Sequence, residues 1–239
     1  MTQKALDELN FLQDLFMWKV LKIGKSCPKM LMYFDLGQKM MKYRIMKMKM
    51  IFAHHLSLLE EDSILNILYQ EQKNWKLPGL VREIEEMLRE VDMSITRMEK
   101  FSKPEWKKFV NEKTDELNNK ELKKWSQSYK KIKADEIEDE KCKIKEYMKN
   151  LPYEDALLRF RLRADMVDSV RCHWKNQSSH AEELWRCWHP GCNMTDQTSH
   201  ITRCLGYADL KEDLTISEDE GLVEFVRRVI QRRKESSDS

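Results

Sequence analysis

The chain has 239 residues, 41% of them hydrophobic and 35% charged, and its formal net charge is +2 at pH 7. A chain of this length and hydrophobic content can bury a real core, so a largely disordered protein and a polycation are both excluded. Only 6 glycines and 5 prolines are present, which leaves little material for the tight turns of an all-β fold. The abundance of Lys, Glu, Leu and Met favours helices. We expect an all-α fold, a helical bundle with long helices.

Helical spacing of apolar residues begins close to the N-terminus and continues through the first part of the chain. The predicted helices cover residues 3–23, a short stretch between Pro28 and Gly37, and residues 39–55, 63–73 and 78–90. Residues 41–50 combine Met and Lys, which is typical of a helix with a soft Met core face and surface lysines. Residues 1–50 carry ten Lys/Arg against four Asp/Glu. Such a basic segment can meet phosphate groups, or it can be a solvated helix face.

Residues 104–149 form a long, strongly charged segment with a narrow apolar stripe. The stripe has helical spacing and consists of Trp106, Val110, Leu117, Trp125, Tyr129 and Ile132. The segment can be one long helix, or a helix broken near Asn118–Asn119. Its stripe fits packing within the chain and equally fits self-association with another copy. Because residues 130–145 mix both signs of charge, we expect a solvated helix face there.

The C-terminal part is expected to hold two further helices. Pro152 precedes an Arg-rich amphipathic pattern over residues 154–174, and a last short helix is predicted over residues 219–234, followed by a disordered tail. Within the first of these, Arg159 and Arg163 lie one helical turn apart. They can contact phosphates from one face, or they can be ordinary exposed arginines.

The sequence shows no signal for a membrane or a secretory pathway. No run of about 18 apolar residues occurs, so no transmembrane helix is expected. The start of the chain carries charges where a signal peptide needs its apolar stretch. We therefore expect a cytoplasmic or nuclear protein without a membrane partner. Thiols stay reduced in these compartments, so the 6 cysteines are interpreted as metal ligands or packing residues and not as disulfides.

One cluster of residues has the chemistry of a zinc site. The segment CWHPGCNMTDQTSHITRC has the spacing Cys-x4-Cys-x7-His-x3-Cys, with the candidate ligands Cys187, Cys192, His200 and Cys204. Zinc prefers thiolate and imidazole ligands in a tetrahedron. A Pro-Gly turn joins the first two cysteines, and one helical turn brings the last two ligands to one face. Four protein ligands leave no position for water, so the predicted Zn²⁺ is structural. Alternatively, these cysteines are small buried apolar residues, and His189 can replace one ligand.

Basic and aromatic side chains surround this cluster. The candidates for nucleic-acid contact are Lys175, Arg186, Trp188 and Arg203, in addition to Arg159 and Arg163. Such side chains can stack on unpaired bases and hold phosphates. They can equally cover the small core of a metal module.

We find no pattern of catalytic residues. Gly-rich phosphate loops, HExxH and G-x-S-x-G are absent. The fragments YFDL (33–36) and YADL (207–210) are similar to the aromatic-x-Asp-Asp signature of polymerase palms, but Leu replaces the second Asp in each. We interpret both as coincidence and expect that the chain is not an enzyme.

The knuckle segment CNMTDQTSHITRC resembles the CCHC zinc knuckle downstream of the polymerase in non-LTR (LINE-like) retrotransposon reverse transcriptases. Three further stretches are similar in order and spacing: CPKMLMYFDLG (27–37), ALLRFRLRADMVDSVRCHWKN (156–176) and GYADLKEDL (206–214). The family spacing is commonly tighter between the first cysteines and one residue longer before the last. The polymerase palm and any endonuclease motif are missing.

The resemblance implies three segments: a helical thumb- or connector-like region (1–100), a long charged helix with the Arg-rich helix (101–176), and a zinc knuckle with the C-terminal helix and tail (177–239). It implies a C-terminal fragment that grips RNA template or target DNA without polymerase activity of its own. The alternative function is a helical protein-interaction scaffold with a structural zinc site. Phosphate binding is salt-sensitive and an apolar protein interface is much less so, which separates the two.

Overall fold

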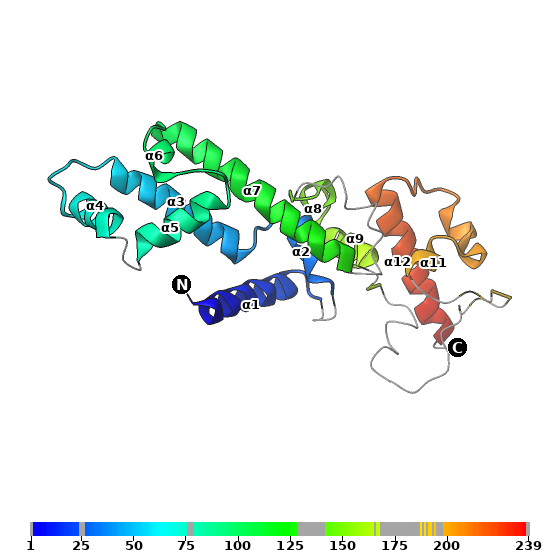
Figure 1. Ribbon diagram of the computed structural model, residues 1–239. Helices are drawn as coiled ribbons and strands as arrows, with labels where there is room; N and C mark the ends of the chain where they lie inside the picture. Colours follow the sequence, from blue (N-terminus) through cyan, green and yellow to red (C-terminus); the bar gives the residue numbers. More distant parts are fainter. Residues whose placement is uncertain are drawn as a thin grey trace. The chain divides into compact units, whose positions relative to one another are not determined.

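A computed structural model describes residues 2–23, 27–75, 79–128, 142–164, 166–167 and 198–237, together with Cys187, His189, Gly191, Cys192 and Met194. Every regular element in these residues is helical, and the one antiparallel bridge there, between Leu36 and Ile144, is isolated (Figure 1). The expected all-α fold is confirmed. In the same part of the chain, no helix is long and apolar enough to cross a membrane. The cytoplasmic or nuclear location stays a prediction.

The chain forms two compact units, each made of two separate stretches. Unit 1 combines residues 1–15 with 37–142, and unit 2 combines residues 16–36 with 143–239. The sequence segments 1–100, 101–176 and 177–239 divide the chain linearly and stay a prediction about its functional regions.

Unit 1 is organised around two long helices that pack against each other. Its elements are the first part of α1 (Gln3–Val20), α3 (Met41–Ser57), α4 (Ile64–Trp75), α5 (Leu80–Arg89), α6 (Ile95–Met98) and α7 (Lys103–Ser128). Trp106 of α7 is fully buried, and its Nε1 donates a hydrogen bond to the Met50 carbonyl of α3 at 3.0 Å. Met46 and Met50 are buried, so α3 has the expected Met core face. The first two residues of the predicted stripe, Trp106 and Val110, therefore pack within the chain, whereas Leu117 and Trp125 are only partly buried.

Helix α7 runs without interruption through Asn118, so the predicted alternative of a break near Asn118–Asn119 is wrong. Asn118 is only 1% exposed, and its Oδ1 accepts a hydrogen bond from the Met40 N–H at the start of α3, at 3.0 Å. Thr114, one turn earlier, is also buried, and its hydroxyl donates to the Val110 carbonyl at 2.8 Å. Two polar side chains thus belong to the buried face of α7, each with a backbone hydrogen-bond partner, one within the helix and one at the start of α3.

The C-terminal end of the charged segment 104–149 does not follow the prediction of a continuous helix. Residues 129–141, with Tyr129 and Ile132 of the predicted stripe, lie outside the described residues. Residues 142–145 are not helical, and Ile144 forms the isolated bridge. The predicted helix face over 130–145 is therefore wrong at its described end.

The Asn118 contact can be tested by substitution. In Asn118→Ala the Met40 N–H loses its acceptor inside unit 1, and an unsatisfied buried donor costs about 1–3 kcal/mol. We expect urea denaturation to show a loss of this size in the free energy of unfolding. Lys120→Ala, at an exposed position of the same helix, should change it little. Equal losses in both variants would contradict the role given to Asn118.

Apart from α12, unit 2 consists of short elements. Its elements are the end of α1, α2 (Lys29–Asp35), α8 (Glu146–Asn150), α9 (Tyr153–Arg163), α11 (Thr198–Ile201), the 3-10 turns η3 (Leu205–Tyr207) and η4 (Asp209–Lys211), and α12 (Asp219–Ser237). As predicted, Pro28 directly precedes α2, and Gly37, with φ +58°, follows it. Helix α9 ends at Arg163, eleven residues short of the predicted end, and Met166 and Val167 are not helical. Helix α12 extends through Ser237, so the tail predicted to be disordered is helical to that point.

A buried carboxylate links three helices of unit 2. Asp35 of α2 is completely buried, and the Tyr147 hydroxyl of α8 donates to its Oδ2 at 2.5 Å. Arg163 of α9 places its Nε 3.5 Å from the same oxygen. Burial, and then the Asp35 charge, raise the pKa of the Tyr147 phenol, so this hydroxyl remains a donor. The network explains why α2 can be buried in spite of its aspartate.

Candidate metal centre

Two local turns position the four candidate ligands. In the first, the Cys192 N–H donates to the His189 carbonyl at 3.0 Å, and Gly191 adopts the left-handed φ of +85° that this turn requires. In the second, α11 ends just after His200, and the Cys204 N–H donates to the His200 carbonyl at 2.8 Å. The predicted helical turn between the last two ligands is therefore present. A third hydrogen bond, from the Cys187 N–H to the Met194 carbonyl at 2.9 Å, closes the loop that contains the first turn.

The four ligand atoms converge on one point. Cys187 Sγ lies 3.6 Å from Cys204 Sγ, and Cys192 Sγ lies 3.3 Å from His200 Nε2. All four ligand atoms lie within 4.8 Å of one another. Zinc–sulfur bonds of about 2.3 Å arranged as a tetrahedron place neighbouring ligand atoms about 3.8 Å apart. The donor set and its spacing therefore fit a tetrahedral cation such as zinc.

His189, the alternative ligand, is exposed and does not belong to this convergent group. Its ring lies against Gly206 instead, so closely that a Cβ at Gly206 would lie 2.2 Å from His189 Cγ. The glycine thus provides room for the first turn to approach the segment after the last ligand.

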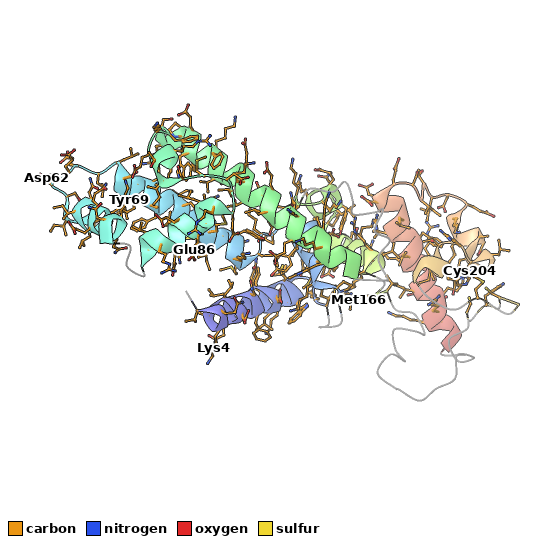
Figure 2. The ribbon with its side chains drawn as sticks, in the orientation of Figure 1. Lys4, Asp62, Tyr69, Glu86, Met166 and Cys204 are labelled. Carbon is orange, nitrogen blue, oxygen red and sulfur yellow. The ribbon has the colours of Figure 1, made fainter. Side chains whose placement is uncertain are left out.

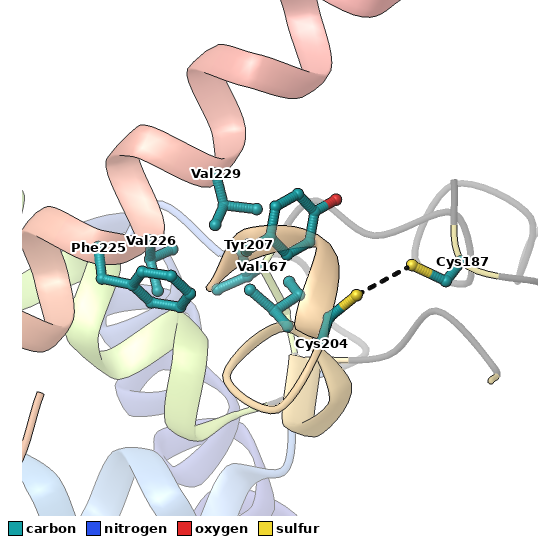
Figure 3. Close-up of a cluster of buried hydrophobic side chains, with 8 residues drawn as sticks. Val167, Cys187, Cys204, Tyr207, Phe225, Val226 and Val229 are labelled. Atoms are coloured by element: carbon teal, nitrogen blue, oxygen red, sulfur yellow. Dashed lines mark hydrogen bonds between the residues drawn. The ribbon is translucent and has the colours of Figure 1, made fainter. Parts of the chain in front are cut away.

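The site is also part of a hydrophobic core, as Figure 3 shows for Cys187 and Cys204. Their exposed fractions are 8% and 1%, and His200 is 7% exposed. The buried residues packed with the two cysteines are Val167, Ile201, Tyr207, Phe225, Val226 and Val229. The metal-ligand and buried-apolar interpretations of these cysteines are therefore compatible. Burial raises the pKa of the Cys187 thiol to about 12. A bound divalent cation has the opposite effect, because it stabilises the thiolate.

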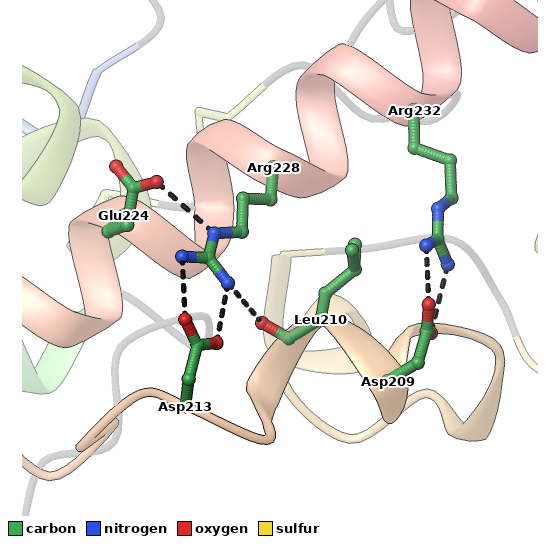
Figure 4. Close-up of polar contacts among 6 residues, drawn as sticks. All are labelled: Asp209, Leu210, Asp213, Glu224, Arg228 and Arg232. Carbon is green, nitrogen blue, oxygen red and sulfur yellow. Dashed lines mark hydrogen bonds and ion pairs between the residues drawn. The ribbon is translucent and has the colours of Figure 1, made fainter.

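Ion pairs join the segment after Cys204 to helix α12 (Figure 4). Both carboxylate oxygens of Asp213 accept from Arg228, at 2.6 and 3.1 Å, and Asp209 accepts from Arg232 at 2.9 Å. These arginine hydrogen bonds lower the pKa of both carboxyl groups. The stabilisation is therefore present above the ordinary carboxyl pKa and is lost as the pH falls through the lowered values. Because the pairs are exposed, we expect them to orient the segment more than to stabilise it.

No protein-family model, curated protein or solved structure matches the chain.

The chain is thus an all-α protein with a small C-terminal Cys3His group that can hold a metal ion such as zinc. The group agrees with the ligand set predicted from spacing. The resemblance to the retrotransposon family stays a prediction from the sequence motifs.

The predicted nucleic-acid contacts have different surroundings. Arg203 is exposed beside the metal centre. Arg159 Nε lies 2.6 Å from Asp219 and its guanidinium lies over the Tyr147 ring, while Arg163 pairs with Asp35. Both of these arginines therefore have partners inside unit 2. Three further candidates lie outside the described residues, namely Lys175, Arg186 and Trp188.

Two apolar residues beside the ligands did not stand out in the sequence. Leu205 is 88% exposed and Met194 is 61% exposed. Together with Arg203 they line a surface pocket of about 460 Å³, whose wall also includes the ligands Cys192, His200 and Cys204. The only signal available in the sequence was their position, since each lies within two residues of a cysteine ligand.

Proposed function

We propose that this chain binds single-stranded nucleic acid through its Cys3His knuckle and has no polymerase activity of its own. In the element that the sequence motifs suggest, it corresponds to the post-polymerase region of a non-LTR retrotransposon reverse transcriptase. There it would grip RNA template or target DNA. The observation that carries the proposal is the convergence of four zinc-type ligand atoms beside an exposed pocket. Zinc held by these four residues would join the two turns, and a filled four-ligand site would leave no position for a reacting water.

The pocket has the chemistry needed for an unpaired nucleotide. Leu205 and Met194 offer apolar surface to the face of a base, and the exposed Arg203 guanidinium can reach a phosphate. His189 lines the same pocket and supplies an aromatic ring for stacking. Arg159 and Arg163 have carboxylate partners in unit 2, so the proposal does not depend on them.

The test uses the zinc-loaded full chain with labelled single-stranded RNA and DNA. Phosphate contacts release counterions, so a site touching about three phosphates should lose roughly tenfold or more in affinity between about 50 and 200 mM salt. Arg203→Ala should weaken binding and make the salt dependence less steep. Leu205→Ala should weaken binding at both salt concentrations.

Lys124→Ala is the matched control, because it removes an exposed cation from α7 in unit 1. It should leave affinity unchanged. Absence of binding by zinc-loaded protein, or equal effects of the Arg203 and Lys124 substitutions, would reject the proposed site. Salt-insensitive association with a protein, without nucleic-acid binding, would favour the scaffold alternative.

A further inference from the structure

Helix α4 of unit 1 has its apolar residues on the outside. The exposed residues form what we call the α4 face, with exposed fractions of 74, 54, 45 and 54% for Ile64, Leu65, Ile67 and Leu68. Single exposed aliphatic side chains are ordinary, but neighbours at positions i, i+3 and i+4 of one helix form a continuous patch. Patches of this kind on a soluble unit mark contact surfaces.

The inward side of α4 is fixed by polar contacts, so the helix cannot turn its apolar side inward without losing them. Asn66 is 5% exposed, and its Nδ2 donates to the carbonyls of Leu59 at 2.8 Å and Glu60 at 3.3 Å. Tyr69, labelled in Figure 2, is 2% exposed on the same inward side. Helix α4 packs against α3 and α5, and the Asn66 bonds hold it to the segment that precedes it. The α4 face is thus a preformed surface.

The border of the α4 face is acidic. Glu61 and Asp62 lie just before the helix, separated from it by Ser63, and Glu71 lies one turn after Ile67 and Leu68 on the same side (Figure 2 labels Asp62). All three are exposed, and none has an ion pair within the part of the chain that the structure describes. Acidic residues before a helix also favour its dipole, but Glu71 lies far from the first turn. The nearby cation Lys73 pairs with Glu99 at 2.8 Å.

We infer that the α4 face docks a basic amphipathic helix of a protein partner. The aliphatic stripe of such a helix covers the four exposed side chains, and its flanking Lys and Arg residues meet Glu61, Asp62 and Glu71. The acidic border repels phosphate, which disfavours nucleic acid and anionic membranes at this face. This interaction is independent of the metal centre and adds a second binding function to the chain.

The experiment uses two synthetic helical peptides and the full chain. Both peptides carry leucines at positions i, i+3, i+4 and i+7, and they are flanked by lysines in one peptide and by glutamates in the other. We expect fluorescence anisotropy to detect binding of the lysine peptide only. Leu68→Ser should weaken that binding by about tenfold or more, as expected for the loss of one buried leucine. In the double variant Asp62→Lys with Glu71→Lys, preference should switch to the glutamate peptide.

Leu12→Ser is the matched control, because Leu12 is a similarly exposed leucine on α1, and it should leave peptide binding unchanged. Circular dichroism should show native helix content in every variant. Equal binding of both peptides would overturn the inference. It would also be overturned if light scattering showed dimers that Leu68→Ser dissolves, because the occupant would then be a second copy. A lower melting temperature of the peptide-free Leu68→Ser chain would indicate coverage by the chain itself, which likewise overturns it.

Discussion

Replacing Cys204 by serine is expected to abolish zinc binding and to unfold the C-terminal part of unit 2 locally. Cys204 is one of four convergent ligands and also packs in the same core as Ile201 and Tyr207. Structural zinc contributes roughly 10–16 kcal/mol of apparent free energy to small zinc modules, far more than a few apolar contacts can replace. Elemental analysis should show about one zinc per wild-type chain and none in the variant. Hydrogen exchange should accelerate over residues 198–214.

Cys142→Ser is the control for this substitution. Cys142 lies in unit 1, where its Sγ donates to the Gln38 carbonyl at 3.2 Å, and a serine hydroxyl can donate in the same place. This variant should keep its zinc and its exchange pattern. If Cys204→Ser retained as much zinc as Cys142→Ser, the assigned ligand set would be wrong.

Replacing Asp35 by alanine is expected to cause the largest loss of stability among substitutions away from the metal centre. The substitution removes the acceptor of the Tyr147 hydroxyl and leaves the mostly buried Arg163 guanidinium without its carboxylate. Breaking one side of a buried ion pair costs about 3–5 kcal/mol. In urea denaturation of the full chain, this loss of stability should appear as a lower denaturation midpoint for unit 2.

Tyr147→Phe separates the contribution of the Tyr147 hydrogen bond to stability from that of the ion pair between Asp35 and Arg163. It removes a single hydrogen bond and should cost only about 0.5–1.5 kcal/mol, because the charge pair with Arg163 remains. Glu154→Ala, which removes an exposed surface pair with Lys22, should have an effect close to zero. If Asp35→Ala and Tyr147→Phe lowered the midpoint equally, the ion pair would contribute nothing to stability.

Helix positions were predictable because apolar spacing persists wherever a helix buries one side. The predicted helices at 3–23, 39–55 and 78–90 correspond to α1, α3 and α5, with ends a few residues away. The orientation of each helix was less predictable. Leu12 and Phe16 have the apolar spacing predicted for α1, yet they are 57 and 68% exposed, because α1 buries Met17 and Trp18 instead. In α4 a buried asparagine determines the orientation, and spacing carries no information about its carbonyl partners.

The metal ligands were predictable for a different reason: zinc coordination requires particular residue types at short separations, and both are visible in a sequence. The residues proposed to contact nucleic acid were harder to predict from residue types and spacing. Arg159 and Arg163 pair with Asp219 and Asp35, which are distant in the chain. The partners of a charge depend on tertiary structure, so spacing along one helix could not identify them.

The discontinuous make-up of the two units has a consequence for biosynthesis. Helix α2 leaves the ribosome early, yet the residues that complete its burial, Tyr147 and Arg163, follow more than a hundred positions later. Throughout that interval residues 37–142 of unit 1 are being made, and α2 lacks the contacts that Tyr147 and Arg163 provide. Chaperone binding to nascent chains should therefore concentrate on residues 27–36 until translation passes α9. Fragments that begin after residue 36 lack α2, so the core of unit 2 should remain incomplete in them.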